Sequence, residues 1–147
     1  MTSTQSLALK IAAGLWVIWG LVHALAGGLI IMGTTAEGFQ AIGDAVDPTL
    51  LEGPYPAAVG GVLDQHAWNL LWFGLVTIIG GVFIWGGNLT AIWVTALIGG
   101  LADLGYFIFI DLAGFAMFFP GTVMTIVSAS AILLSGWVWL TARASAT

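Results

Sequence analysis

The sequence contains no cysteine and very little charge. Without cysteine the chain can form no disulfide, thiolate nucleophile, cysteine-held iron–sulfur cluster or haem attached through a Cys-x-x-Cys-His motif. Of the 147 residues only two are basic and seven acidic, so that 6% are charged, against about 25% in an ordinary soluble domain. Two basic residues cannot neutralise a run of phosphates, which excludes ordinary nucleic-acid binding.

The chain is rich in apolar residues, which make up 60% of it, and its mean hydropathy is +1.08. The surface of a soluble globular protein needs more charged residues than this chain has, and we therefore expect the chain to be surrounded by lipid. A helix needs about 20 residues to cross a bilayer. Four apolar runs are long enough to do so, at residues 7–33, 61–86, 89–112 and 122–142. None alternates as the strands of a membrane β-barrel do. Because backbone groups in hydrocarbon must bond internally, the runs predict an all-α, integral membrane four-helix up-down bundle that forms a single transmembrane domain.

The connections between the runs differ in length and chemistry. Gly86-Gly87-Asn88 predicts a tight turn between the second and third spans. The outer loop of residues 34–60 is the long connection, and it holds four acidic residues, Glu37, Asp44, Asp47 and Glu52. Within it Phe39, Ile42 and Val46 recur at i, i+3 and i+7, a spacing that predicts a short amphipathic helix on the membrane surface or over the end of the bundle.

The two basic residues, Lys10 and Arg143, flank the first and fourth spans on one membrane side. By the positive-inside rule we expect both termini in the cytoplasm and a multi-pass protein of the inner (plasma) membrane. The lipid bilayer is then the main partner, and the small size also suits a homo-oligomer or a subunit of a larger membrane complex.

Small residues predict where the helices pack most closely. Gly20, Ala24 and Gly28 follow one another at i, i+4 and i+8 in the first span. Such seams let two helix backbones approach in a membrane.

Polar residues inside the spans are the candidates for function. A central Asp costs about 2.5–3.5 kcal/mol on insertion scales, so such groups usually face a protein interior. Counting residues from the outer ends places four polar side chains within about one helical turn of each other in height. Two more polar residues belong with these four: a His that lies higher in the second span, and a Tyr on the same face of the third span as the Asp. Together they predict a buried polar cluster in the outer half of the bundle. The ligand-binding candidates are His23, His66, Asn69, Asp103, Tyr106 and Ser128. Asp64 and Asp111 are expected to lie at the outer surface as solvated ends, Asp111 without a partner.

Four interpretations of this cluster remain open. It can be interhelical hydrogen bonding with no ligand. It can hold a metal through His23, His66 and Asp103, because two imidazoles and a carboxylate are a known ligand set. A b-type haem can be held between His23 and His66, and a proton or cation path can run through Asp103 and Tyr106.

The sequence therefore favours a small four-span binding or accessory protein whose polar cluster holds a small ligand. One alternative is a membrane enzyme or redox protein that uses a metal or haem at the same residues; the other is an oligomeric channel or transporter. No phosphate-binding loop, Gly-x-Ser-x-Gly elbow or His-Glu-x-x-His motif is present, so no soluble-enzyme chemistry is indicated. The ligand, and whether the chain is an enzyme, stay open at this level.

Overall fold

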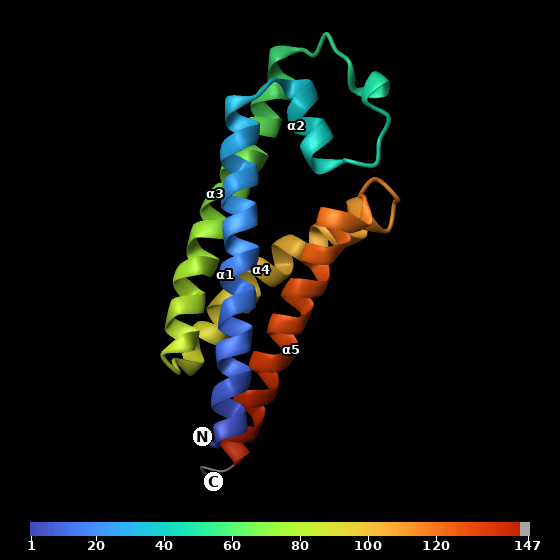
Figure 1. The fold of residues 1–147 in the computed structure, drawn as a ribbon. Coiled ribbons are helices and arrows are strands. Elements are labelled where there is room, and N and C mark those ends of the chain that lie inside the picture. Colours follow the sequence, from blue (N-terminus) through green and yellow to red (C-terminus); the bar gives the residue numbers. More distant parts are fainter. Residues whose placement is uncertain (145–147) are drawn as a thin grey trace.

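The computed structural model describes residues 1–144, and of residues 143 and 144 only the helical backbone. Four long helices run alternately up and down: α1 (Ser3–Met32), α3 (Ala57–Trp85), α4 (Leu89–Tyr106) and α5 (Val123–Ala144). The start of α1 and the end of α5 lie at one end of the bundle (Figure 1), called here the proximal end, and α2 (Thr35–Ile42) lies at the opposite, distal end. The prediction of an all-α four-helix bundle is confirmed.

All four long helices can cross a membrane by length and composition. The spans are Ser3–Met32, Ala57–Trp85, Leu89–Asp111 and Phe118–Ala142. Large apolar side chains cover their outer faces, with Leu25, Leu101 and Leu133 each more than half exposed, as the lipid-facing surface of a multi-pass membrane protein requires. The chain is accordingly a multi-pass membrane protein with the bilayer as its surroundings.

The distal tip between α4 and α5 is less regular than the rest. Helix α4 continues into the π-helical turn η2 (Phe107–Asp111), and a second such turn, η3 (Phe118–Thr122), precedes α5. The Phe119–Pro120 peptide bond within η3 is cis. The tip is tied to the first long connection, because the Ala45 N–H donates to the Phe115 carbonyl oxygen over 3.0 Å.

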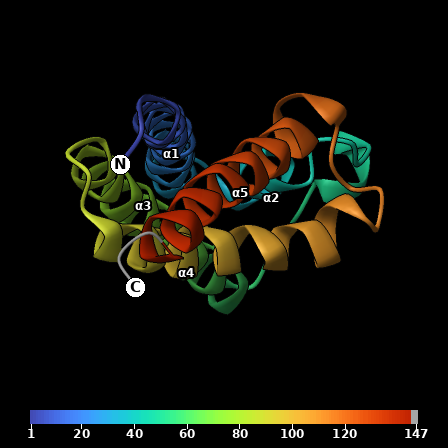
Figure 2. The same ribbon diagram turned by 90° about the horizontal axis from the view of Figure 1, so that it is seen from below.

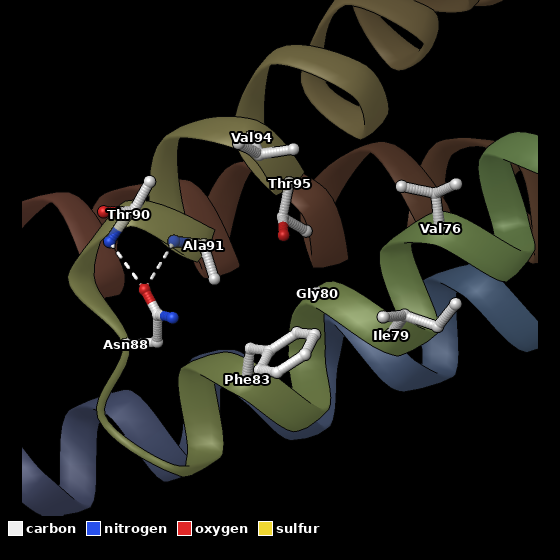
Figure 3. Close-up of a pocket in the computed structure, with 9 residues that line it drawn as sticks. All are labelled: Val76, Ile79, Gly80, Phe83, Asn88, Thr90, Ala91, Val94 and Thr95. Carbon is white, nitrogen blue, oxygen red and sulfur yellow. Dashed lines mark hydrogen bonds between the residues drawn. The ribbon is translucent and has the colours of Figure 1, made fainter.

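Local sequence signals explain where the helices begin. Thr34 opens α2 with a capping box, in which its side chain and that of Glu37 bond to each other's backbone N–H. Asn88 opens α4 by accepting from two backbone N–H groups through its side-chain oxygen, as Figure 3 shows. Gly87 before it takes a positive φ of 84°, which glycine adopts without strain. The predicted tight turn is therefore present.

Helices α1 and α3 pack backbone against backbone. A methyl group added at Gly20 would lie 2.6 Å from the Gly74 carbonyl oxygen, and one at Gly74 would lie 2.5 Å from the Ala24 nitrogen. The seam continues at Gly27, while nothing lies within 4 Å of a methyl group at Gly28. The expectation that Gly28 extends the seam is therefore wrong. Contacts that follow i, i+4 and i+7 stay on one face of a helix with 3.6 residues per turn better than i, i+4 and i+8 do.

The two helix pairs diverge toward the distal end. In Figures 1 and 2, α4 and α5 lean away from α1 and α3, which stay side by side. Trp16 and Trp19 are fully buried in the core that the four long helices share. At the distal end, Phe39 and Ile42 of α2 pack on a second core cluster of Ile30, Leu63 and Ala67. The predicted amphipathic helix is confirmed over Thr35–Ile42, where it covers the end of the α1–α3 pair, whereas Val46 lies beyond its C-terminal end.

Candidate ligand-binding site

The buried carboxyl group of Asp103 is the centre of the candidate site. Asp103 lies on the inward face of α4 and is 3% exposed. The Ser128 hydroxyl of α5 donates to its Oδ2, while its Oδ1 is buried with no hydrogen-bond partner among residues 1–144. One oxygen of this acid is thus satisfied by the protein and the other is not.

His23 and Trp19 of α1 face this acid. Their rings stack with centroids 3.6 Å apart and an interplanar angle of 18°, and His23 Nδ1 lies 2.8 Å from the Trp19 carbonyl oxygen. A carbonyl oxygen can only accept, so we assign the proton to Nδ1, which leaves Nε2 of a neutral ring as an acceptor. The His23 ring is within electrostatic reach of Asp103, and the Trp19 indole N–H interacts with the same carboxyl without reaching the geometry of a full hydrogen bond.

Several further buried polar atoms have no partner in the described part of the chain. The atoms are Trp16 Nε1 on α1 and Thr125 Oγ1 on α5, beside Trp19 Nε1 and Asp103 Oδ1. Thr95 Oγ1 on α4 is unpartnered too, but it points toward Gly80 of α3, on the proximal side. The Trp16 ring packs on Gly99, one turn below Asp103 on α4. The large majority of buried polar side-chain atoms in proteins are partnered, and Asp103 Oδ1 and Thr125 Oγ1 belong to residues that line one groove between α4 and α5.

An apolar groove between α4 and α5 leads to the acid. It has a volume of about 320 Å³ and is lined by Gly100, Asp103, Leu104, Phe107, Thr125, Ser128, Ala129 and Ile132. Its rim includes the exposed residues Leu104 and Ala129, which face the surroundings of the bundle. A molecule in the bilayer can therefore reach Asp103 from the side.

Two more carboxyl groups lie above Asp103 at the distal tip. The Thr122 hydroxyl donates to Asp111 Oδ1 over 2.8 Å, and Asp111 Oδ2 is buried without a partner in the described residues. Asp44 accepts from the Met117 N–H. Tyr106 lies within electrostatic reach of Asp44, Asp111 and Asp103. The expectation that Asp111 has no partner is therefore wrong, because the turn η3 brings Thr122 to it.

The two candidates on α3 lie apart from this group. His66 is exposed and lines a separate groove of about 570 Å³, between α2, α3 and Ile110 of η2. Asn69 accepts from the Trp72 indole N–H of its own helix over 3.1 Å. Neither side chain hydrogen-bonds to Asp103, His23 or Ser128 within residues 1–144. The site is built by α1, α4 and α5.

The metal and haem interpretations require His66 to join His23. No group of three or more His, Asp or Glu side chains within the described residues lies close enough to hold a metal ion. His23 stacks on Trp19, whereas His66 borders the groove beneath α2. The structure therefore does not bring His23, His66 and Asp103 together as one ligand set.

A third groove lies at the proximal end of the α3–α4 hairpin. It has a volume of about 280 Å³, and Figure 3 shows Thr95 pointing across it toward Gly80. Its other lining residues are Val76, Ile79, Phe83, Asn88, Thr90, Ala91 and Val94. With no titratable side chain in this lining, the groove offers no acid–base or charge-based chemistry.

The sequence places Trp19 on the same face of the first span as His23, but Trp19 was not predicted as a site residue. Sequence reasoning missed the contributions of Asp44 and Asp111, because the loop and the tip that hold them meet only in the folded chain. No protein-family model, no curated protein and no solved structure matches the chain.

Proposed function

We propose that the chain is a small membrane-embedded binding protein, and that Asp103, Ser128 and His23 hold the polar end of a small ligand. One observation carries the proposal: Asp103 is buried at the floor of a groove open to the bilayer, and one of its oxygens has no partner in the described residues. An unsatisfied buried acceptor costs about 1–3 kcal/mol. The nearest protein donor, the Trp19 indole N–H, approaches the carboxyl without completing a hydrogen bond.

The magnitudes also favour binding over structural hydrogen bonding. Interhelical hydrogen bonds in membranes contribute about 0.6 kcal/mol on average, whereas a central Asp costs about 2.5–3.5 kcal/mol to insert. The hydrogen bond between Ser128 and Asp103 therefore does not offset the free-energy cost of inserting Asp103 into the membrane. Ionisable residues kept at such a net cost usually take part in function.

The groove indicates the shape of the ligand. Its volume of about 320 Å³ lies at the lower end of the range for small-molecule sites, about 300–1,000 Å³. Apolar side chains line the way in, and polar atoms gather only at the floor. This suits an amphiphile whose polar end reaches Asp103 while its apolar part remains against Leu104 and Phe107.

The proposal extends to the setting of the chain. We place it in the inner (plasma) membrane with both termini in the cytoplasm, because Lys10 and Arg143 lie at the proximal end. The site then lies in the outer half of the bilayer. A homo-oligomer, or a subunit of a larger membrane complex, is the proposed working form, since the four spans leave most of their residues exposed to neighbours.

Extraction of bound molecules tests this function. The wild-type protein is reconstituted in nanodiscs directly from native membranes, and bound molecules are extracted and identified by mass spectrometry. Asp103→Asn is the test variant, and Leu101→Ala, on the lipid-facing side of the same helix, is the matched control. We expect one molecule per chain in wild type and control and at least tenfold less in Asp103→Asn. Equal amounts in a folded Asp103→Asn protein, or none in wild type, would make the cluster structural.

A further inference from the structure

The distal half of the protein contains acids without a protein cation to balance them. The chain has only two basic residues, and both lie at the proximal end. The Lys10 ammonium sits 5.7 Å from the centroid of the Trp85 ring at the end of α3, and Arg143 belongs to the last turn of α5. The carboxyl groups of Asp44, Asp103 and Asp111 therefore share one region with no Lys or Arg.

The same region offers hydrogen-bond acceptors. Asp103 Oδ1 has no hydrogen bond of full geometry in the described residues, where only the Trp19 indole N–H approaches the carboxyl. Nε2 of a neutral His23 is an acceptor once Nδ1 donates to the Trp19 carbonyl. A ligand that satisfies both must donate at least two hydrogen bonds.

We propose, on the basis of the binding function above, that the ligand is a lipophilic amine bound as its ammonium cation. Its N–H groups donate to Asp103 Oδ1 and to His23 Nε2. Its hydrocarbon part occupies the groove between α4 and α5, against Leu104, Phe107 and Ile132. The charge of the ammonium group balances that of an ionised Asp103, a role that no Lys or Arg takes in the distal half of the described residues.

Two other amphiphile classes fit less well. A fatty acid would bring a carboxylate toward Asp103 and Asp111, and like charges repel in a medium of low dielectric constant. A fatty alcohol donates a single hydrogen bond and leaves the charge of Asp103 unbalanced. The site therefore discriminates between ligands by their head group and not by their hydrocarbon chain.

The distal acids support the same class. Asp44 and Asp111 lie above Asp103, with Tyr106 within electrostatic reach of all three. A surface lined by one sign of charge raises the local concentration of ions of the opposite sign. Cations are thus concentrated at the end of the bundle where the site lies.

Three probes with one chain length test the head group. Dodecylammonium, dodecanol and dodecanoate are titrated at pH 7.5 into the purified protein in a non-ionic detergent, and thermal unfolding is followed by tryptophan fluorescence. We expect dodecylammonium to raise the unfolding temperature of wild type saturably, with the other two probes at least tenfold weaker. In Asp103→Asn the dodecylammonium effect should weaken at least tenfold, and Leu101→Ala should behave as wild type.

The outcomes separate the ligand class from the binding function. If dodecanol or dodecanoate matches dodecylammonium on wild type, the cation assignment is overturned, a result that needs no variant. The assignment also fails if Asp103→Asn keeps the full response to dodecylammonium. If no probe acts but an Asp103-dependent molecule is extracted from membranes, only the ligand class is wrong. If no probe acts and nothing is extracted, both the ligand class and the binding function are wrong.

Discussion

An alanine at position 27 would push a methyl group into the backbone of α3. That methyl carbon would overlap the Ala67 carbonyl oxygen and would lie 2.6 Å from the Leu71 nitrogen. Ordinary contacts begin near 3.4 Å, so the Leu71 contact alone requires the helices to separate locally by about 0.8 Å. Overpacking of this kind costs about 1–3 kcal/mol, and backbone atoms cannot turn aside as a flexible side chain can.

The neighbouring glycine provides the control. Alanine gains about 1 kcal/mol over glycine in a helix interior, at position 27 and at position 28 alike. A methyl group at Gly28 meets nothing within 4 Å. The difference between Gly27→Ala and Gly28→Ala therefore isolates the cost of the seam, which we expect to be about 1–3 kcal/mol.

Reversible unfolding in mixed micelles of dodecyl sulfate and a non-ionic detergent, followed by circular dichroism, measures this difference. Gly27→Ala should have the lower free energy of unfolding, and Gly28→Ala should equal wild type or exceed it slightly. If Gly28→Ala is as unstable as Gly27→Ala, the close approach of α1 and α3 does not run through Gly27.

Three further predictions follow from the described contacts. Ser128→Ala leaves the carboxyl group on α4 without its hydrogen bond and should lower the free energy of unfolding by about 1–3 kcal/mol; a loss under about 0.5 kcal/mol would contradict the bond. Gly80→Ala brings a methyl group to 3.0 Å from the Thr95 Cβ, so a double-mutant cycle with Thr95→Ala should show coupling, and strict additivity would refute the contact. Hydrogen bonds from the backbone N–H and hydroxyl of Thr34 hold the pKa of Glu37 below its ordinary 4.5. The stability that they give α2 is therefore present above pH 4.5 and lost as pH falls through the lower, folded value. Carboxyl-carbon NMR should show this lowered pKa, and Thr34→Ala, which removes the hydroxyl but keeps the backbone N–H, should raise it only part of the way back.

The four membrane-spanning helices were predictable because the length of each apolar run is enough to identify them. Residues that cannot be solvated must lie in lipid, and lipid permits few backbone conformations. The turn at Gly87 and the amphipathic helix around Phe39 follow from equally local rules. The lean of α4 and α5 away from the other pair (Figure 2) depends on contacts between distant segments, and no short-range pattern encodes it.

The candidate site was predictable only in part. Depth along a helix follows from counting residues, which is why Asp103 and Ser128 were expected at one level, where they do bond. The direction of a side chain around the helix axis also depends on tilt and on nearby partners. Asn69 shows this, because its oxygen is used by Trp72 of its own helix. His66 shows it as well, since it borders a different groove.

Native mass spectrometry of the intact chain tests the central claim most directly. The claim is that Asp103 holds a ligand in the distal half of the bundle. Wild type and Leu101→Ala released gently from nanodiscs should carry one lipophilic amine per 15.3 kDa chain, and Asp103→Asn should carry none. A wild-type chain that shows only its own mass, or an Asp103→Asn chain that keeps the same adduct, would contradict the claim.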